Sequence, residues 1–86
     1  MEHISSNSKE SSALVKIGGI YKHYKGNEYK VLMLSRSCDD LSWWVVYQTL
    51  YENDISQIWH RKLEDFLSIE TWPGHTIPTP RFALIK

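Results

Sequence analysis

The stretch YKHYKGNEYKV, residues 21–31, decides how the chain begins to fold. The glycine and asparagine at residues 26–27 are a two-residue turn signal, and the runs on both sides are rich in tyrosine and other strand-forming residues. Two such runs joined by a tight turn pair as antiparallel strands. The stretch therefore predicts a β-hairpin with strands over residues 20–25 and 28–36.

The expected register of this hairpin forms favourable cross-strand pairs. Lys25 faces Glu28 with opposite charge and Tyr24 faces Tyr29, and each pair stabilises the hairpin by roughly 0.2–1 kcal/mol. Side chains alternate between the two faces of a strand. One face, which we assign to the core, carries Ile20, Tyr24, Tyr29, Val31 and Met33. The other face carries Tyr21, His23, Lys25, Glu28 and Lys30, a set that the hairpin alone does not explain.

The rest of the chain predicts a mostly β, single-domain fold. Further strands are expected at residues 43–51, 55–60 and 81–86, and a helical turn at residues 61–67. We expect the core to hold Val31, Met33, Val45 or Val46, Leu63, Phe66 and Phe82. Residues 1–16 are rich in serine and charge and predict a disordered tail. Residues 17–86 then form a small SH3-like antiparallel barrel of about five strands.

Composition narrows the function classes. The 86 residues carry no net charge, and Cys38 is the single cysteine, so an intrachain disulfide and a cysteine-based zinc site are excluded. The four histidines are not spaced as metal ligands, and no glycine motif for phosphates is present, so we expect neither metal nor cofactor. Without a signal peptide or an apolar run of about 20 residues, the expected location is the cytoplasm.

Four ordered motifs resemble one bacterial family. They are G-x-Y-x-H-Y-K-G-N-x-Y-x-V at residues 19–31, VVYQTLY at 45–51, W-x-R at 59–61 followed by Phe66, and PRF at 80–82. Together they are similar to the family of domain of unknown function 1653 (DUF1653), whose members are small proteins of the SH3-like barrel kind. Lys62 stands where the family usually has proline, and Trp43-Trp44 where it usually has a polar residue. The resemblance implies a fold and no activity.

Three kinds of function compete. The first is a non-enzymatic recognition module for a protein, a peptide or a small anionic ligand, because SH3-like barrels often bind extended peptides in aromatic grooves. The second is single-stranded nucleic-acid binding by aromatic stacking and lysines, although the pI near 6.9 is not that of a basic binder. The third is a small enzyme that uses His23 with an arginine, but no recognisable set of catalytic residues supports it.

The candidate ligand-binding residues are Tyr21, His23, Lys25, Tyr47, Trp59, Arg61 and Arg81. An arginine can hold a carboxylate or phosphate through two parallel hydrogen bonds, and we expect the strip of Tyr21, His23 and Lys25 to lie beside one of the two arginines. Each candidate also has a structural interpretation. The arginines can form ion pairs with nearby acids, and the aromatic residues can fill the core.

Overall fold

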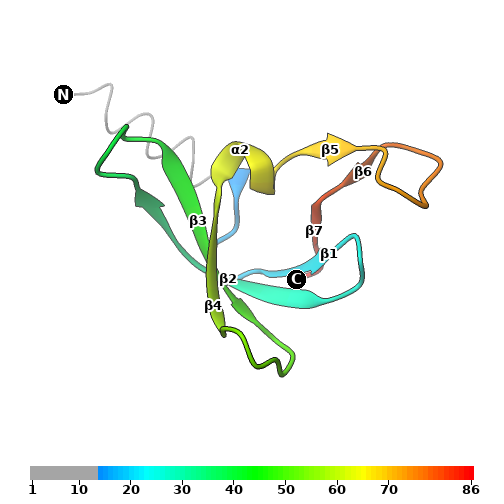
Figure 1. Ribbon diagram of the computed structural model, residues 1–86, viewed down its shortest axis with the longest axis horizontal. Helices are drawn as coiled ribbons and strands as arrows, with labels where there is room; N and C mark the ends of the chain where they lie inside the picture. The colour runs from blue at the N-terminus through cyan, green and yellow to red at the C-terminus, as the bar shows by residue number, and fades with distance from the viewer. Residues whose placement is uncertain (1–13) are drawn as a thin grey trace.

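Five antiparallel strands form the main sheet, in the order β4-β3-β2-β1-β7 (Figure 1). The computed structural model describes residues 14–86. The elements are β1 (Ile20–His23), β2 (Glu28–Arg36), β3 (Trp43–Thr49), β4 (Ile58–Lys62), α2 (Leu63–Phe66), β5 (Ile69–Glu70), β6 (Thr79–Pro80) and β7 (Phe82–Leu84). The mostly β fold with one short helix is confirmed. The sheet is open, because β4 and β7 are its two edges and are not paired with each other.

The packed unit begins before the strand at Ile20. Residues 1–13 of the predicted disordered tail lie outside the described residues, but residues 14–16 lie within them. Val15 is fully buried in the core cluster. Val15 lies within the predicted tail, so the packed residues extend at least one residue before the expected start at residue 17.

The first hairpin differs in register from the prediction. Tyr21 lies opposite Tyr29, and Lys22 opposite Glu28. The loop has three residues instead of two, since the Gly26 N–H donates to the His23 carbonyl and the His23 N–H donates to the Asn27 carbonyl, both at 2.8 Å. Gly26 adopts a φ of 111°, as expected where a turn ends in a residue with positive φ.

This register changes the predicted positions of two tyrosines. Tyr24 leaves the strand and stacks on Trp72, with ring centroids 4.3 Å apart and planes 2° apart. Tyr21 is only 6% exposed and belongs to the core. The prediction that Tyr21 lies on an outer face was wrong, because it assumed the shorter loop.

A bulge in β2 explains a second difference. Val31 lies opposite Tyr47 and Met33 opposite Val46, so Leu32 is an extra residue without a direct partner on β3. One extra residue reverses the alternation of side chains beyond it. Val31 is fully buried, whereas Met33, which was predicted to be in the core, is 52% exposed.

Aromatic rings make up most of the core. Phe66 on α2 stacks on Phe82 of β7, with centroids 4.2 Å apart and planes 8° apart. Tyr21 meets Phe66 edge-on at 5.2 Å. The predicted burial of Val31, Val45, Phe66 and Phe82 is confirmed, and Leu63 is partly buried against the same cluster.

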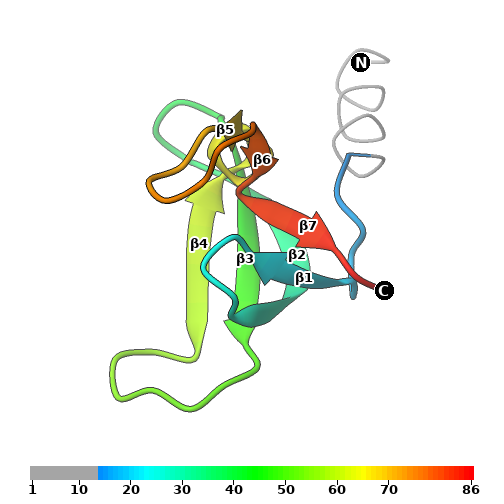
Figure 2. The ribbon, with the colours of Figure 1, turned by 90° about the vertical axis from the view of Figure 1, so that its right-hand side faces the viewer.

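The remaining elements lie around this sheet. β4 stands at one outer edge (Figure 2), and β5 and β6 form a small sheet beyond α2 (Figure 1). No helix within residues 14–86 is long and apolar enough to cross a membrane.

Candidate ligand pocket

A pocket of about 330 Å³ opens between β2, β3, β4 and the loop over residues 50–57. The register sets Trp59 opposite Tyr47 and Arg61 opposite Val45, which places both β4 side chains on the face of the sheet that carries the core. The pocket is lined by Tyr29, Tyr47, Tyr51, Asn53, Ile55, Trp59 and Arg61. We call it the tyrosine pocket.

The three tyrosines form one wall of the pocket. Tyr29 meets Tyr47 edge-on at 5.3 Å and Tyr51 edge-on at 5.5 Å. The hydroxyls of Tyr29 and Tyr51 are 2.9 Å apart, and either one can be the donor. Burial, and then the hydrogen bond with Tyr51, raises the pKa of Tyr29 far above its usual value, so this phenol keeps its proton. Two hydroxyls that share one hydrogen bond leave a second O–H able to donate to a ligand.

Asn53 presents an amide donor whose orientation is determined by its neighbours. Its Oδ1 accepts hydrogen bonds from the backbone N–H groups of Ile55 at 2.9 Å and Ser56 at 3.0 Å. Since the oxygen must face these donors, the NH₂ group must face the other way. The Nδ2 atom is buried and has no acceptor among residues 14–86.

Arg61 supplies a second donor without a partner. Its Nε is buried and donates to no acceptor among residues 14–86, while the guanidinium carbon lies 5.9 Å from the centre of the Phe82 ring. A buried donor that makes no hydrogen bond costs about 1–3 kcal/mol, and more when it is charged. Both side chains line the tyrosine pocket, which therefore combines a guanidinium and a carboxamide that each keep one buried donor without an acceptor among residues 14–86.

His23 lies next to this pocket without lining it. Its ring packs against Phe82 at 5.0 Å and Tyr29 at 6.5 Å. Burial lowers the pKa of His23 to about 4, helped by the positive charges of Arg61, Arg81 and Lys25. The ring is therefore neutral at pH 7. Its Nδ1 accepts a hydrogen bond from the Lys25 N–H at 3.1 Å, which places the proton of the neutral ring on Nε2.

The structure brings three of the predicted site residues together, namely Tyr47, Trp59 and Arg61. Tyr21 is not among them, because its ring is in the core and its hydroxyl accepts from the Lys16 N–H at 2.9 Å. The predicted strip of Tyr21, His23 and Lys25 therefore does not form a continuous outer face. A base cannot stack on the ring of Tyr21 while that ring is buried.

Arg81 does not line the tyrosine pocket and has partners of its own. Its Nε donates to the Asp65 carbonyl at 2.9 Å and to the Ser68 Oγ at 3.1 Å. The guanidinium lies 4.6 Å from the centre of the Trp72 ring. Lys25 is exposed in the hairpin loop, so among the predicted cations only Arg61 lines the tyrosine pocket.

Tyr29 and Asn53 were not predicted to line a pocket, and Tyr51 was not among the selected candidate residues. Tyr29 was assigned to the core, and Tyr51 to a strand that ends two residues earlier, at Thr49. An asparagine between two acids in a turn was the available signal for Asn53, because asparagine side chains often accept from backbone N–H groups two residues on. The sequence does not show the direction in which the Nδ2 atom of Asn53 points.

The donor set is suited to an anion. No group of three His, Cys, Asp or Glu side chains within residues 14–86 is arranged to hold a metal ion. The guanidinium, the carboxamide NH₂ and the phenol of the tyrosine pocket are all groups that can donate hydrogen bonds. A carboxylate accepts such bonds on two oxygens and forms charge-assisted pairs with arginine.

The comparisons with known proteins agree on one family. The sequence profile of the family described as protein of unknown function (DUF1653) matches residues 19–84. A crystal structure of a protein belonging to DUF1653 from Bordetella bronchiseptica is similar to this chain with a TM-score of 0.71 and 32% sequence identity. The match covers 79% of this chain and 85% of that chain. No curated protein matches.

Proposed function

The chain belongs to the DUF1653 family, which is described without a function, and from the tyrosine pocket we propose that it is a non-enzymatic recognition module for a carboxylate or another small anionic group. The group belongs to a protein, a peptide or a small ligand. Arg61 and Asn53 donate to its oxygens, and the tyrosine wall packs against its apolar part.

The observation that carries this proposal is the pair of unsatisfied donors. The Nε of Arg61 and the Nδ2 of Asn53 are both buried without an acceptor among residues 14–86, and both side chains line one pocket. Elsewhere on the chain, Arg81 donates to two oxygens. A bound carboxylate would relieve the cost of the two buried donors and would gain from the low polarity of the aromatic wall.

The SH3-like barrel is part of the same proposal. A five-stranded antiparallel order with a short helix after β4 supports this fold class. Binding of an extended partner against aromatic residues is a recurring mode of such folds. We place the protein and its ligand in the cytoplasm, in agreement with a single exposed free cysteine, Cys38.

The test uses two probes that differ in charge and share their shape. Phenylacetate and its neutral amide are titrated into the protein while the Trp59 indole N–H is followed by NMR. This group donates to the Ser56 carbonyl at 3.1 Å at the rim of the pocket. Phenylacetate is expected to bind about tenfold more tightly than phenylacetamide, because a hydrogen bond to a charged group contributes about 1.5–3 kcal/mol.

Arg61→Gln is expected to remove this preference for charge. Arg36→Gln is the matched control, because Arg36 is exposed and its guanidinium lies 4.2 Å from the Trp43 ring, away from the pocket residues. The control variant should keep the preference. Equal affinity for the two probes, or a preference that survives in Arg61→Gln, would show that the pocket does not recognise a carboxylate.

A further inference from the structure

The free edge of β4 carries backbone groups that point away from the sheet. The Thr49 N–H donates to the Gln57 carbonyl at 2.9 Å, so this opposed pair is hydrogen-bonded. Hydrogen-bonded and non-hydrogen-bonded pairs alternate along antiparallel strands. In the register of β3 and β4, Trp59 and Arg61 therefore bond to β3, whereas Ile58 and His60 direct their N–H and C=O groups outward.

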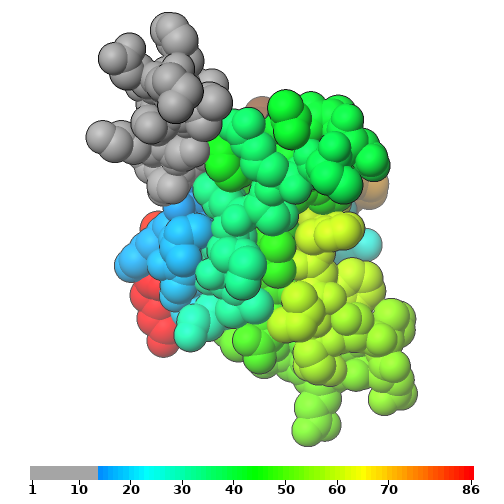
Figure 3. Space-filling model, turned by 90° about the vertical axis from the view of Figure 1, so that its left-hand side faces the viewer, coloured from blue at the N-terminus to red at the C-terminus, as the bar shows by residue number. Residues whose placement is uncertain are grey.

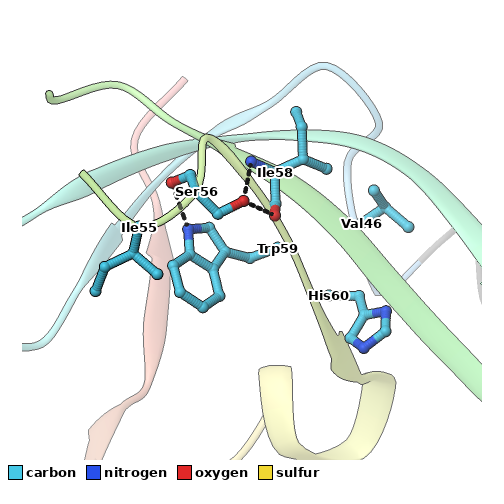
Figure 4. Close-up of a pocket in the computed structure, with 6 residues that line it drawn as sticks. All are labelled: Val46, Ile55, Ser56, Ile58, Trp59 and His60. Carbon is cyan, nitrogen blue, oxygen red and sulfur yellow. Dashed lines mark hydrogen bonds between the residues drawn. The ribbon is translucent and has the colours of Figure 1, made fainter. Parts of the chain in front are cut away.

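Ser56 closes this edge at one end. Its Oγ donates to the Ile58 carbonyl at 2.7 Å and accepts from the Ile58 N–H at 3.2 Å (Figure 4). These contacts confirm that the backbone of Ile58 faces the edge. By the same alternation, His60 and Lys62 are the remaining residues of β4 whose N–H and C=O are directed outward. Because α2 begins at Leu63, the free edge between Ser56 and the helix is short.

A groove runs beside this edge. It has a volume of about 310 Å³ and is lined by Val46, Ile55, Ser56, Ile58, Trp59 and His60. Ile55 and Trp59 lie on one side of β4, and Val46 and His60 lie on the other (Figure 4). β4 and the loop before it project on the face of the molecule shown in Figure 3. We call this surface the edge groove.

The edge groove and the tyrosine pocket are neighbours. Ile55 and Trp59 line both of them. The tyrosine pocket offers buried donors, whereas the walls of the edge groove are mostly apolar, with Ile55 82% exposed and Ile58 50% exposed. A partner that reaches both sites needs an acidic group and an apolar group on opposite sides of its backbone.

We propose that a short extended peptide segment pairs with β4 at His60 as an additional strand, with an acidic side chain in the tyrosine pocket and the adjacent apolar side chain in the edge groove. This rests on the proposed function. In an added strand the residue opposite His60 points to the outer face of the sheet, and its neighbours point to the face of Trp59 and Arg61. The acidic and apolar residues are therefore adjacent in the peptide sequence.

Charge and edge length support a peptide over a second copy of this chain. Arg61 and Asn53 complement an acidic side chain. The Ser56 hydrogen bonds stop the outward-facing edge at Ile58, and blocked or very short edges oppose pairing of sheet with sheet. One exchanged pair of backbone hydrogen bonds at His60 suffices to set the register of a short segment.

The first experiment varies the spacing in the peptide. Two acetylated, amidated short peptides of equal composition are compared, one with an aspartate between two isoleucines and one with a serine separating the aspartate from each isoleucine. The adjacent arrangement is expected to bind about tenfold more tightly, and to protect the His60 amide from hydrogen exchange. Equal affinity of the two peptides, or an unprotected His60 amide, would overturn the added strand.

The second experiment removes the backbone donor. Proline is tolerated on an edge strand where the N–H faces away from the sheet, so His60→Pro removes the N–H and the side chain, and His60→Ala removes the side chain alone. We expect His60→Pro to bind the peptide about tenfold more weakly than His60→Ala does. Both variants lack the imidazole that lines the edge groove, and only His60→Pro also lacks the backbone donor. Equal binding by both variants would refute the backbone contact, and the His60 amide measurement decides the matter if His60→Pro does not fold.

The two proposals fail in different ways. Both variants keep Arg61 and Asn53, so phenylacetate should bind them as it binds the parent. If phenylacetate binds the parent more tightly than Arg61→Gln while the two peptides bind the parent with equal affinity, the carboxylate site is supported and the strand addition is wrong. If phenylacetate and its amide bind alike, the tyrosine pocket itself is not a carboxylate site.

Discussion

Replacing Phe66 with alanine removes the ring that joins α2 to the sheet. Phe66 is 1% exposed. Its ring stacks on Phe82 at 4.2 Å and also contacts Tyr21 at 5.2 Å and Tyr47 at 5.8 Å. These partners come from β7, β1 and β3, so the substitution opens a cavity between three strands and the helix.

The loss of stability follows from the buried area. An aromatic side chain buries about 150–250 Å², which at about 25 cal/mol per Å² corresponds to about 4–6 kcal/mol. Alanine keeps a small part of this area, and the cavity adds to the cost, so about 3–5 kcal/mol is expected. At roughly 0.05–0.15 kcal/mol per residue, a domain of this size has a total of about 4–13 kcal/mol. The variant therefore loses a large part of its stability.

Urea unfolding followed by tryptophan fluorescence measures this loss. Met33→Ala is the matched comparison, because Met33 was predicted to be in the core and the bulge in β2 instead leaves it 52% exposed. We expect about 0.5 kcal/mol or less for Met33→Ala. A cost below about 1 kcal/mol for Phe66→Ala would refute the packing of α2, and a cost above about 2 kcal/mol for Met33→Ala would refute the bulge.

Three further predictions concern the charged groups around the core. The His23 ring should titrate with a pKa of about 4 by NMR. In Arg61→Gln this pKa should rise but stay below 6.5, because burial is the larger cause of the shift. An unchanged pKa in Arg61→Gln would show that the charge of Arg61 does not act on the His23 ring. The pKa of His23 is lower in the folded chain than the value of 6.5 expected when unfolded, so between these two values the unfolded chain binds the extra proton. The free energy of unfolding should therefore keep its full value above pH 6.5 and decrease as pH falls toward about 4. His23→Gln should flatten this part of the stability curve, and an equally steep curve would contradict the assignment. Arg81→Gln should lower the free energy of unfolding by about 1–3 kcal/mol, because it loses the contacts with Trp72 and the Asp65 carbonyl. Its affinity for phenylacetate should equal that of the parent, and a weaker affinity would show that Arg81 contributes to the tyrosine pocket.

Burial was predictable where local spacing decides it. Phe66 lies in a short helical turn with apolar spacing, and Val45 lies in a dense strand, and both are buried as predicted. Tyr21 and Met33 were assigned to the wrong face of the sheet. One extra residue in the hairpin loop or in the bulge of β2 changes which side chains of two paired strands share a face. A single extra residue leaves little trace in composition, so the register could not be derived from the hairpin sequence alone.

The candidate site was predictable in its residue types more than in its assembly. Trp59 and Arg61 were selected because aromatic rings and a guanidinium suit an anionic ligand, and the register of β4 brings both to one pocket. Asn53 was not predicted, because its role depends on two backbone N–H groups in the loop that orient its amide. Tyr21 and Arg81 have the same chemistry as the pocket residues, but packing assigns them to the core and to the contact with Trp72.

The most direct test of the carboxylate site follows the Arg61 Nε–H itself by ¹H,¹⁵N NMR during titration with phenylacetate. This proton has no acceptor among residues 14–86, so an incoming carboxylate should shift its resonance downfield and slow its exchange with water. The Nε–H of Arg36 serves as the reference and should stay in place. The account predicts a saturable shift at Arg61 with phenylacetate and none with phenylacetamide. An Arg61 resonance that does not move while phenylacetate binds elsewhere, or that moves equally with both probes, would contradict it.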